Sequence, residues 1–326
     1  MPRIDVHHHF FPPTLDKAKS GKDVGFKTPA ENLPWTPEIS IRSMDASGTD
    51  IAVLSFPAIS SGAIGAENRR LTRDRNHFVA EICRKYPGRF GFFATVPFLD
   101  DAEGVLEEIR YTLDELGAQG ISLPSSYGDG PSAKYVGDDC YDAVWGELNR
   151  RQTVVFLHGA QTPSSTPYPH ASLGIPIVEV PNETFKAAAH LVVTGRKRKH
   201  PDVKIILAHL GGSILSLAPR VAILSGHMGC NLTPDEIIDD FKSFYYETAL
   251  SAHETTLTAV DSFVSHKQLL FGTDFPAVST EMATWYTNSL NKFYQDRPDV
   301  LDSIHYKNAL RIFPQLNLEK AGASVD

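Results

Sequence analysis

Short runs of β-branched and aromatic residues recur along this chain, and segments with helical periodicity separate them. Several runs, among them 154–157 and 205–208, are continuously apolar, as are strands of a parallel sheet that is buried on both faces. The eight runs cover residues 3–8, 51–56, 90–96, 120–123, 153–158, 204–209, 244–248 and 269–273. This alternation restricts the chain to an α/β architecture built on a parallel sheet.

The segments between the runs carry helix start and stop signals. Residues 101–116 have apolar side chains at helical spacing, and Gly117 follows as a C-terminal stop. Asn182 is expected to cap the helix that follows the fifth run. Thr233 stands three residues before Glu236, which is the spacing of a capping box.

Eight strands that alternate with helices predict one (β/α)₈ barrel, in which residues 1–326 form a single domain. The alternative is a doubly wound open sheet, but no Gly-x-Gly-x-x-Gly follows the first run. Two connections are long, 10–37 after the first strand and 159–181 after the fifth. Both follow a carboxyl end, where barrel enzymes carry their active sites, so we expect pocket walls, a lid or an oligomer contact.

The charge balance and the cysteines narrow the range of partners and compartments. With 31 Lys+Arg, 39 Asp+Glu and a net charge of −8, the chain is not expected to bind nucleic acid or an anionic membrane. The one basic run, 196–200, is expected to be the solvated end of a helix. Three cysteines without a Cys-x-x-Cys indicate neither a disulfide framework nor a thiolate zinc site. Without a signal-peptide core or a stretch of about 18 apolar residues, a cytoplasmic protein is expected.

Polar titratable residues gather at the carboxyl ends of the predicted strands. Residues two apart on a strand point to the same side, so His7 and His9 can point together while His8 points away. Closure of a barrel brings the eighth strand beside the first, with the fifth and sixth strands across the mouth. The residues concerned are Asp5, His7, His9, His158, His209 and Asp274.

This grouping predicts a metal site. A lone histidine at a strand end is more often a hydrogen-bonded packing residue than a ligand. Here, however, the candidate groups stand at the carboxyl ends of four strands, and none stands at an amino end. Neutral imidazoles with a carboxylate suit a divalent cation such as zinc, and three histidines with one aspartate leave a position for water or substrate.

Four motifs at these strand ends and one helical segment resemble those of the amidohydrolase superfamily. The resemblance is to the branch that contains aminocarboxymuconate-semialdehyde decarboxylase and the non-oxidative decarboxylases of hydroxybenzoates. It covers about residues 3 to 312, and the combination of motifs is more specific than His-x-His alone. The matching segments are Ile4-Asp5-Val6-His7-His8-His9, Phe156-Leu157-His158, Leu207-Ala208-His209-Leu210-Gly211-Gly212, Phe271-Gly272-Thr273-Asp274-Phe275-Pro276, and Arg42-Ser43-Met44-Asp45 before Gly48.

The resemblance implies a role for each site residue. His7, His9, His158 and Asp274 would be the metal ligands, and His209 would be an unliganded catalytic histidine. Binuclear members typically bridge two metals with a modified lysine on the fourth strand, but residues 120–124 contain no lysine. One divalent ion is therefore expected, with zinc as the first choice and manganese as the alternative, and no organic cofactor.

The substrate-binding residues of the branch can be assigned to this sequence only in part. Arg220 lies eleven residues after His209, where the muconate-semialdehyde branch has an arginine that crosses a dimer interface to hold a substrate carboxylate. This position implies a homodimer, although a surface or structural role for Arg220 stays open. The branch also has an arginine in the loop after the first strand, whereas residues 10–35 contain only lysines as basic groups, and no glutamate closely follows His209.

The implied reaction is the metal-dependent, non-oxidative decarboxylation of an ortho-hydroxy aromatic acid. The opening segment 5–13 most resembles the decarboxylases of 6-methylsalicylate, which release m-cresol and CO₂. Asp274 is the expected proton donor for an aromatic substrate, and His209 for a muconate-like one. The alternatives are a metal-dependent hydrolase of the lactonase or amidohydrolase type, and a decarboxylase of a muconate-semialdehyde-like acid.

Overall fold

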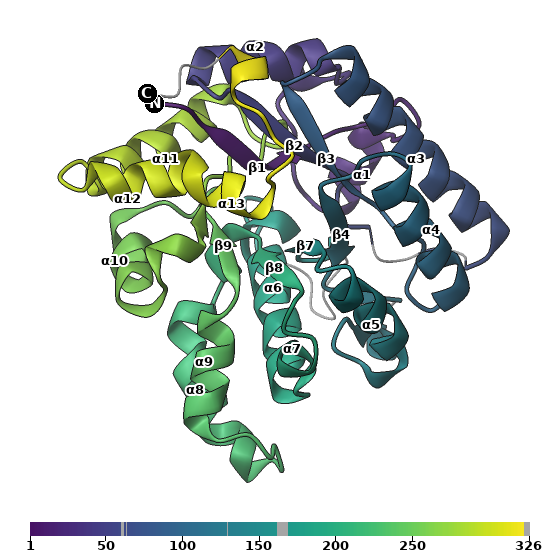
Figure 1. Cartoon of the computed structure of the whole chain (residues 1–326), viewed down its shortest axis with the longest axis vertical. Helices are drawn as coiled ribbons and strands as arrows, with labels where there is room; N and C mark the ends of the chain where they lie inside the picture. The colour runs from purple at the N-terminus through teal and green to yellow at the C-terminus, as the bar shows by residue number, and fades with distance from the viewer. Residues whose placement is uncertain (60–61, 63, 129, 162–168, 323–326) are drawn as a thin grey trace.

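The computed structural model describes residues 1–59, 62, 64–128, 130–161 and 169–322. Eight parallel strands lie at the centre with helices around them, which confirms the predicted (β/α)₈ fold (Figure 1). In spatial order they are β1 (Ile4–His9), β2 (Ile51–Ser55), β3 (Phe90–Ala94), β4 (Gly120–Pro124), β7 (Val154–His158), β8 (Lys204–Leu207), β9 (Tyr245–Glu247) and β10 (Leu269–Leu270). A separate antiparallel pair consists of β5 (Ser126–Tyr127) and β6 (Lys134–Tyr135).

The barrel closes between β1 and the segment that follows β10. The Val6 amide donates to the Phe271 carbonyl at 2.9 Å, and His8 forms a parallel bridge with Phe275. This contact places Asp274 beside the histidines of β1, because its own amide donates to the His7 carbonyl at 2.8 Å.

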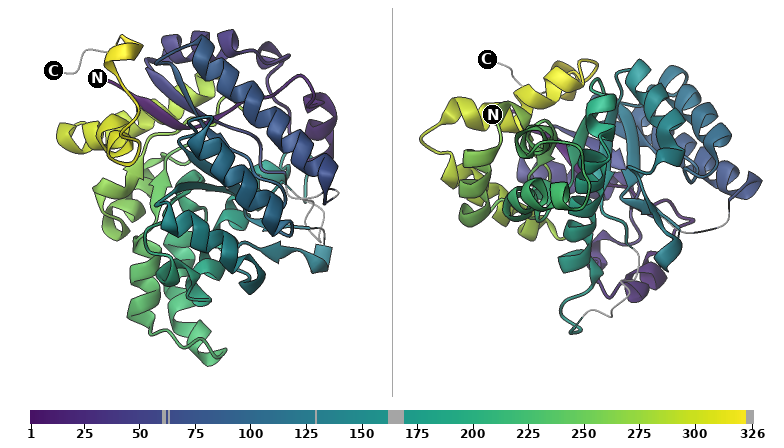
Figure 2. Two further views of the ribbon diagram at one scale, coloured as in Figure 1. Left: turned by 45° about the vertical axis from the view of Figure 1, so that its right-hand side comes forward. Right: turned by 90° about the horizontal axis from the view of Figure 1, so that it is seen from below.

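The helices surround the strands, and none of those described is long and apolar enough to cross a membrane. The segment after β1 contains α1 (Lys17–Asp23), which lies at the opposite end of the barrel from α13 (Asn308–Ile312; Figure 2). The pair α8 (Ile214–His227) and α9 (Pro234–Lys242) projects from the body at the lower end of Figure 1. The helices are α1 (Lys17–Asp23), α2 (Pro37–Ser47), α3 (Ala66–Lys85), α4 (Ala102–Asp114), α5 (Asp142–Arg150), α6 (Ile175–Val193), α7 (Arg196–Lys199), α8 (Ile214–His227), α9 (Pro234–Lys242), α10 (Glu254–Phe263), α11 (Thr280–Phe293), α12 (Pro298–Asp302) and α13 (Asn308–Ile312).

Alternation along the strands separates two apolar layers. On β7, Val154 and Phe156 face the barrel interior, whereas Val155 and Leu157 pack against the surrounding helices. Inside the barrel, the Phe156 ring stacks on Phe93 with centroids 5.3 Å apart, and Phe93 contacts Phe313 at 5.7 Å. This aromatic column fills the interior beneath the carboxyl ends of the strands.

Three local expectations differ from the structure. Helix α6 begins at Ile175, so Asn182 is an internal residue and does not cap the helix; its side chain accepts a hydrogen bond from Ser213 instead. The helix also shortens the connection predicted at 159–181, of which residues 162–168 lie outside the described residues. The basic run is not solvated at its start, because Arg196 is only 4% exposed and forms ion pairs with Asp139 and Asp142.

The capping box at α9 is confirmed. The Thr233 hydroxyl accepts from the Glu236 amide at 3.3 Å, and the Glu236 carboxylate accepts from the Thr233 amide at 2.8 Å. Two of the amides that a helix leaves unpaired at its start are thus satisfied by neighbouring residues. The local spacing alone was sufficient to predict this helix start.

Candidate metal centre and active-site cavity

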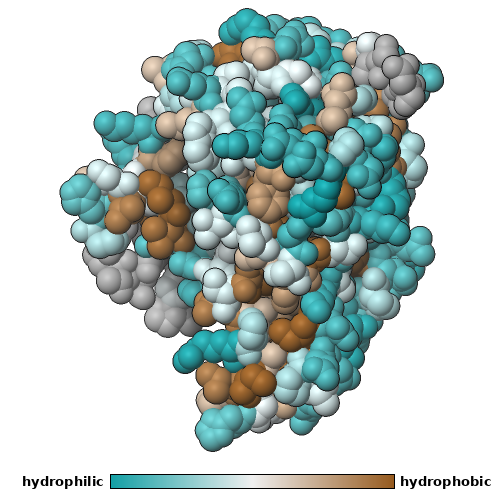
Figure 3. Space-filling view, turned by 90° about the vertical axis from the view of Figure 1, so that its left-hand side faces the viewer, coloured by the Kyte–Doolittle hydropathy of each residue, from teal (hydrophilic) through white to brown (hydrophobic). Residues whose placement is uncertain are grey.

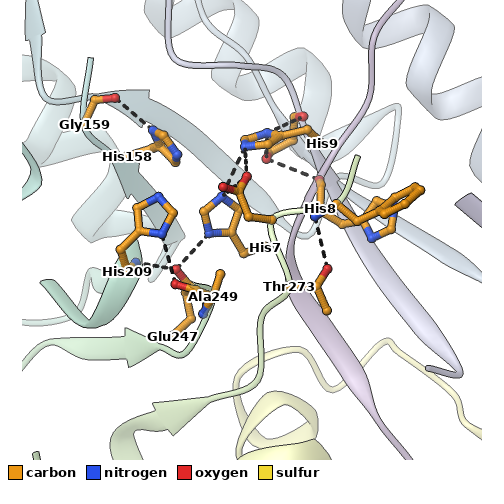
Figure 4. Close-up of polar contacts among 12 residues, drawn as sticks. His7, His8, His9, His158, Gly159, His209, Glu247, Ala249 and Thr273 are labelled. Atoms are coloured by element: carbon orange, nitrogen blue, oxygen red, sulfur yellow. Dashed lines mark hydrogen bonds and ion pairs between the residues drawn. The ribbon is translucent and has the colours of Figure 1, made fainter. Parts of the chain in front are cut away.

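Four histidine rings converge at the carboxyl end of the barrel (Figure 4). His7 and His9 come from β1, His158 ends β7, and His209 follows β8. Neighbouring rings lie close: the centroids are 4.9 Å apart for His7 and His9, 5.1 Å for His7 and His158, and 5.3 Å for His158 and His209. All four side chains are buried, so side chains distant in the sequence form one compact cluster.

Asp274 completes the cluster from the segment after β10. Its Oδ1 lies 3.4 Å from His7 Nε2 and 3.1 Å from His9 Nε2, and these two nitrogens are 3.1 Å apart. Two overlapping groups have ligand atoms within 4.8 Å of one another, and His7 belongs to both; they are His7, His9 and Asp274, and His7, His158 and His209. Every residue predicted to hold the metal is therefore in this cluster, together with His209.

Each histidine is oriented by an acceptor behind it. Nδ1 of His9, His158 and His209 donates to a main-chain carbonyl, that of Ser55 at 3.2 Å, Gly159 at 2.9 Å and Ala249 at 3.1 Å respectively. Because a carbonyl oxygen can only accept, the proton lies on Nδ1 and the Nε2 lone pair faces the cluster. Nδ1 of His7 contacts the Glu247 carboxylate at 2.8 Å.

This donor set fits a divalent metal ion. Nε2 of His7 and of His9 are too close to one another for two facing lone pairs, unless a proton or a cation lies between them. Imidazole nitrogens with their second nitrogen tied to a carbonyl or carboxylate, next to one carboxylate, form the usual ligand set of zinc and related ions. His7, His9, His158 and Asp274, with His209 beside them, are therefore the residues that could hold it.

Glu247 is a site residue that the sequence did not single out. It is fully buried at the end of β9, and its Oε1 accepts from the His209 amide at 2.5 Å as well as contacting His7. Its Oε2 accepts from the Ala249 amide at 2.7 Å. One carboxylate thus fixes His7 and the backbone that carries His209. Its place at a strand's carboxyl end was the available signal.

The electrostatics of the cluster favour one proton on His7. Burial disfavours the charged form of His7, but Glu247 and Asp274 outweigh it and raise its pKa to about 10. Burial lowers the pKa of His9 and lowers that of His158 well below its usual value, so both rings are neutral donors. Burial would raise the pKa of Asp274, but His7 and His9 hold it well below its usual range, so Asp274 is ionised.

A bulge in β1 decides which of its histidine side chains face the cluster. Register runs from Asp5 opposite Ala52 to His8 opposite Leu54, so β1 uses one residue more than β2 over this interval. His8 consequently faces away from the cluster, where its ring contacts Asp5 at 3.0 Å and Ser40 at 2.8 Å.

Asp5 lies outside the cluster as well and serves to connect strands. Its Oδ1 accepts from the amides of His7 at 3.0 Å and Thr273 at 3.1 Å, and its Oδ2 accepts from the Thr273 hydroxyl at 2.5 Å. Asp5 therefore ties β1 to the segment that carries Asp274. It positions the cluster without facing it.

The backbone at the site departs from ordinary conformations. His209 has φ +57° and Asp274 has φ +64°, values that cost non-glycine residues roughly 1–3 kcal/mol each. Gly272 is required by close approach, because a Cβ there would lie 2.1 Å from Glu247 Oε2 and 2.9 Å from His7 Cβ. The glycine of the Phe271-Gly272-Thr273-Asp274 segment thus lets Glu247 reach His7.

A cavity of about 470 Å³ opens over the cluster. His9, His158, His209 and Asp274 lie on its floor, and most of the wall is apolar. The segment after β1 contributes a large part of the wall, and the start of α6 and the segment from 277 to 286 contribute most of the rest. The apolar and aromatic wall residues are Phe11, Val24, Phe26, Pro29, Pro57, Pro176, Ile177, Val180, Pro181, Leu250, Ala277, Val278, Met282 and Tyr286.

Arg220 does not line this cavity in the chain described. It lies on the exposed side of α8, and Ile223 and Leu224, which follow it by three and four residues on the same helix face, are 66% and 45% exposed. Figure 3 shows brown apolar patches on this side of the molecule, including the lower end where α8 and α9 project.

The whole chain has known relatives. It is 36% identical to the 6-methylsalicylic acid decarboxylase acuB of Aspergillus aculeatus, over 98% of each chain. It is 34% identical to the 6-methylsalicylic acid decarboxylase of Penicillium expansum, over 98% of this chain and 99% of that one. A crystal structure of a dihydroxybenzoic acid decarboxylase from a Polaromonas species, with bound manganese and the inhibitor 2-nitroresorcinol, has the same fold, with a TM-score of 0.81, 24% identity and 98% coverage of each chain.

A sequence profile of the amidohydrolase family matches residues 4–315. That range contains all four barrel segments that build the histidine and aspartate cluster: β1, the end of β7, the segment after β8 and the segment after β10. The chain belongs to the amidohydrolase family.

Proposed function

We propose that this protein is a metal-dependent, non-oxidative decarboxylase of an ortho-hydroxy aromatic acid, which converts 6-methylsalicylate to m-cresol and CO₂. One observation carries the proposal. The buried histidine and aspartate cluster lies on the floor of a largely apolar cavity, in a chain 36% identical over 98% of its length to a 6-methylsalicylic acid decarboxylase. The apolar wall suits a methylated aromatic ring.

His7, His9, His158 and Asp274 would hold a single divalent ion, zinc or manganese. Such an ion supplies a Lewis acid for the phenolate and carboxylate oxygens of an ortho-hydroxy acid and polarises the ring between them. The ligand side chains are fixed in advance by the acceptors behind them, so little reorganisation accompanies binding.

Decarboxylation replaces the carboxylate by hydrogen. The ring carbon gains a proton, the bond to the carboxyl carbon breaks, its electron pair stays with the ring, and CO₂ leaves. Asp274 is ionised and faces the cavity, so it would take the proton of the ortho-hydroxyl group and deliver it to the ring carbon. His209, whose Nδ1 is tied to the Ala249 carbonyl, presents Nε2 to the cluster and is the alternative donor for a muconate-like acid.

The proposal includes a homodimer in which Arg220 of one subunit reaches the substrate carboxylate of the other. Two features support it. Arg220 has no ion pair or hydrogen bond among the described residues, and it shares a helix face with the exposed Ile223 and Leu224. An exposed helix face that combines apolar side chains with a guanidinium is typical of a protein interface.

The test is incubation of purified, Zn²⁺- or Mn²⁺-loaded protein with 6-methylsalicylate, followed by chromatography for m-cresol and a measurement of CO₂. We expect the two products in equal amounts. His158→Ala should lower turnover at least about 1,000-fold and reduce bound metal, because it removes a ligand. His170→Ala, in the exposed segment before α6, serves as the control and should change neither.

Turnover of another hydroxybenzoate without turnover of 6-methylsalicylate would contradict the substrate assignment. Hydrolysis of a lactone to a ring-opened acid without CO₂ would contradict decarboxylation and favour the hydrolase alternative. Both outcomes are read by the same chromatographic separation, so one set of incubations decides between them.

A further inference from the structure

Charged side chains are scarce on the wall of the active-site cavity. Among the described lining residues, the only carboxylate is Asp274, and the only cations besides the histidines are Lys17 and Lys27. Lys27 is exposed and lies at the rim, whereas Lys17 is partly buried. Lys17 is therefore the cation placed to meet a ligand inside the cavity.

The surroundings of Lys17 hold its ammonium group against the cavity wall. Lys17 is the first residue of α1, and its Nζ lies 4.9 Å from the centroid of the Phe11 ring, which is itself buried and lines the cavity. No hydrogen bond or ion pair of its side chain to the described residues is present. Burial lowers the pKa of Lys17, and Asp274 is the one charge that counteracts this effect.

A partly buried cation without a counter-ion is costly, and none of the described residues forms an ion pair with the Lys17 ammonium, although Asp274 acts on it from a distance. Asp274 is within 3.4 Å of His7 Nε2 and 3.1 Å of His9 Nε2, so its charge is already engaged by the cluster. The uncompensated charge of Lys17 thus faces a cavity whose wall is mostly apolar, where an anion is held more strongly than in water.

We propose that Lys17 binds the carboxylate of the aromatic acid substrate and orients it over the cluster. This inference rests on the proposed function. The contact is specific to the carboxylate, because this group becomes neutral CO₂ as the bond breaks, and the product keeps only its ring oxygen, which the cluster would hold. Lys17 therefore stabilises the bound acid more than the transition state, and its loss raises KM more than it lowers kcat.

The test compares Lys17→Met with wild type, both loaded with metal. We expect KM for 6-methylsalicylate to rise about 10- to 100-fold, as for loss of one charged hydrogen bond, and kcat to stay within about threefold. The inhibition constant of m-cresol, which has the hydroxyl but no carboxylate, should change less than about twofold. Lys17→Arg should restore most of the lost affinity.

Matched controls come from the same segment. Lys19 and Lys22 lie on α1 but not on the cavity wall, and Lys27 lies at its rim. Lys19→Met and Lys22→Met should leave KM unchanged, and Lys27→Met should raise it less than Lys17→Met does. Metal content and thermal unfolding are measured for every variant, so that loss of the ion or of the fold is recognised.

Two results would overturn the proposal. An unchanged KM in Lys17→Met would show that the ammonium does not contact the acid. Equal weakening of m-cresol and 6-methylsalicylate would assign Lys17 to the hydroxyl or to the shape of the cavity. If wild type does not convert 6-methylsalicylate, the proposed function fails, but calorimetric titration of wild type and Lys17→Met with salicylate and with phenol still decides the role of Lys17.

Discussion

At the scale of single residues, the site is organised by side chains that never face the cavity. The Glu247 carboxylate contacts His7 Nδ1 and accepts hydrogen bonds from the backbone amides of His209 and Ala249. Asp5 joins β1 to the segment that carries Asp274. Such outer partners fix ring orientation, and removing them typically lowers metal affinity 10- to 100-fold. The geometry of the cluster therefore depends on two carboxylates that are not among the proposed metal ligands.

The raised pKa of His7 predicts a pH dependence of metal binding. With a pKa of about 10, His7 carries a proton at pH 7.5 that an incoming cation must displace. Affinity should therefore rise about tenfold for each pH unit between pH 7 and 9, with about one proton released. Titration calorimetry in buffers of different ionisation enthalpy measures this release.

The control for this prediction is Glu247→Gln. Removing the negative charge of Glu247 lowers the pKa of His7, so fewer protons should be released at pH 7.5 although the ligands are unchanged. A release that is the same in both proteins, or an affinity independent of pH, would show that His7 is already neutral. In the metal-free protein the sign is opposite: stability gained from charged His7 is full below about pH 6.5 and is lost as pH rises through about 10.

At the scale of elements, the sequence predicted those features of the fold that depend on residues close together in the chain. The apolar runs predicted all eight barrel strands because burial on both faces leaves a local pattern, and the histidines and Asp274 stand at the ends of those runs. The extra residue in β1 was not predictable, because it depends on pairing with β2.

Two other features escaped prediction for physical reasons of their own. Asn182 gives a helix-start signal in the interior of α6, where the earlier start at Ile175 supersedes it. Glu247 looks like any strand-end carboxylate until the fold places His7 2.8 Å from it. Contacts between elements, rather than propensities within them, decide such cases.

Two glycines provide opposite expectations for substitution by alanine. At Gly272 a Cβ would meet Glu247 Oε2 at 2.1 Å, so Gly272→Ala should displace Glu247, destabilise the fold by more than about 2 kcal/mol and reduce bound metal. Gly146, within α5, has open space around its Cβ position, so Gly146→Ala should stabilise by about 0.5–1 kcal/mol. Chemical denaturation and metal analysis check both; similar stabilities for the two variants would contradict the role of Gly272.

At the scale of the whole molecule, the exposed face of α8 predicts self-association. Ile223 and Leu224 would be buried in a dimer, and a buried glutamate there would be strongly unfavourable. Wild type should sediment with twice the chain mass of 35.9 kDa, and Ile223→Glu should sediment as a monomer. Ile64→Glu, which places the same charge at an exposed apolar residue after β2, should leave the mass unchanged. A monomeric wild type would contradict the homodimer and the proposed role of Arg220.

The aromatic column of Phe156, Phe93 and Phe313 limits how a ligand can reach the cavity and leave it. It fills the barrel interior beneath the cluster, so among the described residues the cavity is not reached along the barrel axis. Under the proposed function, the aromatic acid and the phenol formed from it would then use the opening of the cavity at the carboxyl ends of the strands. The product is therefore expected to compete with the substrate for the same cavity.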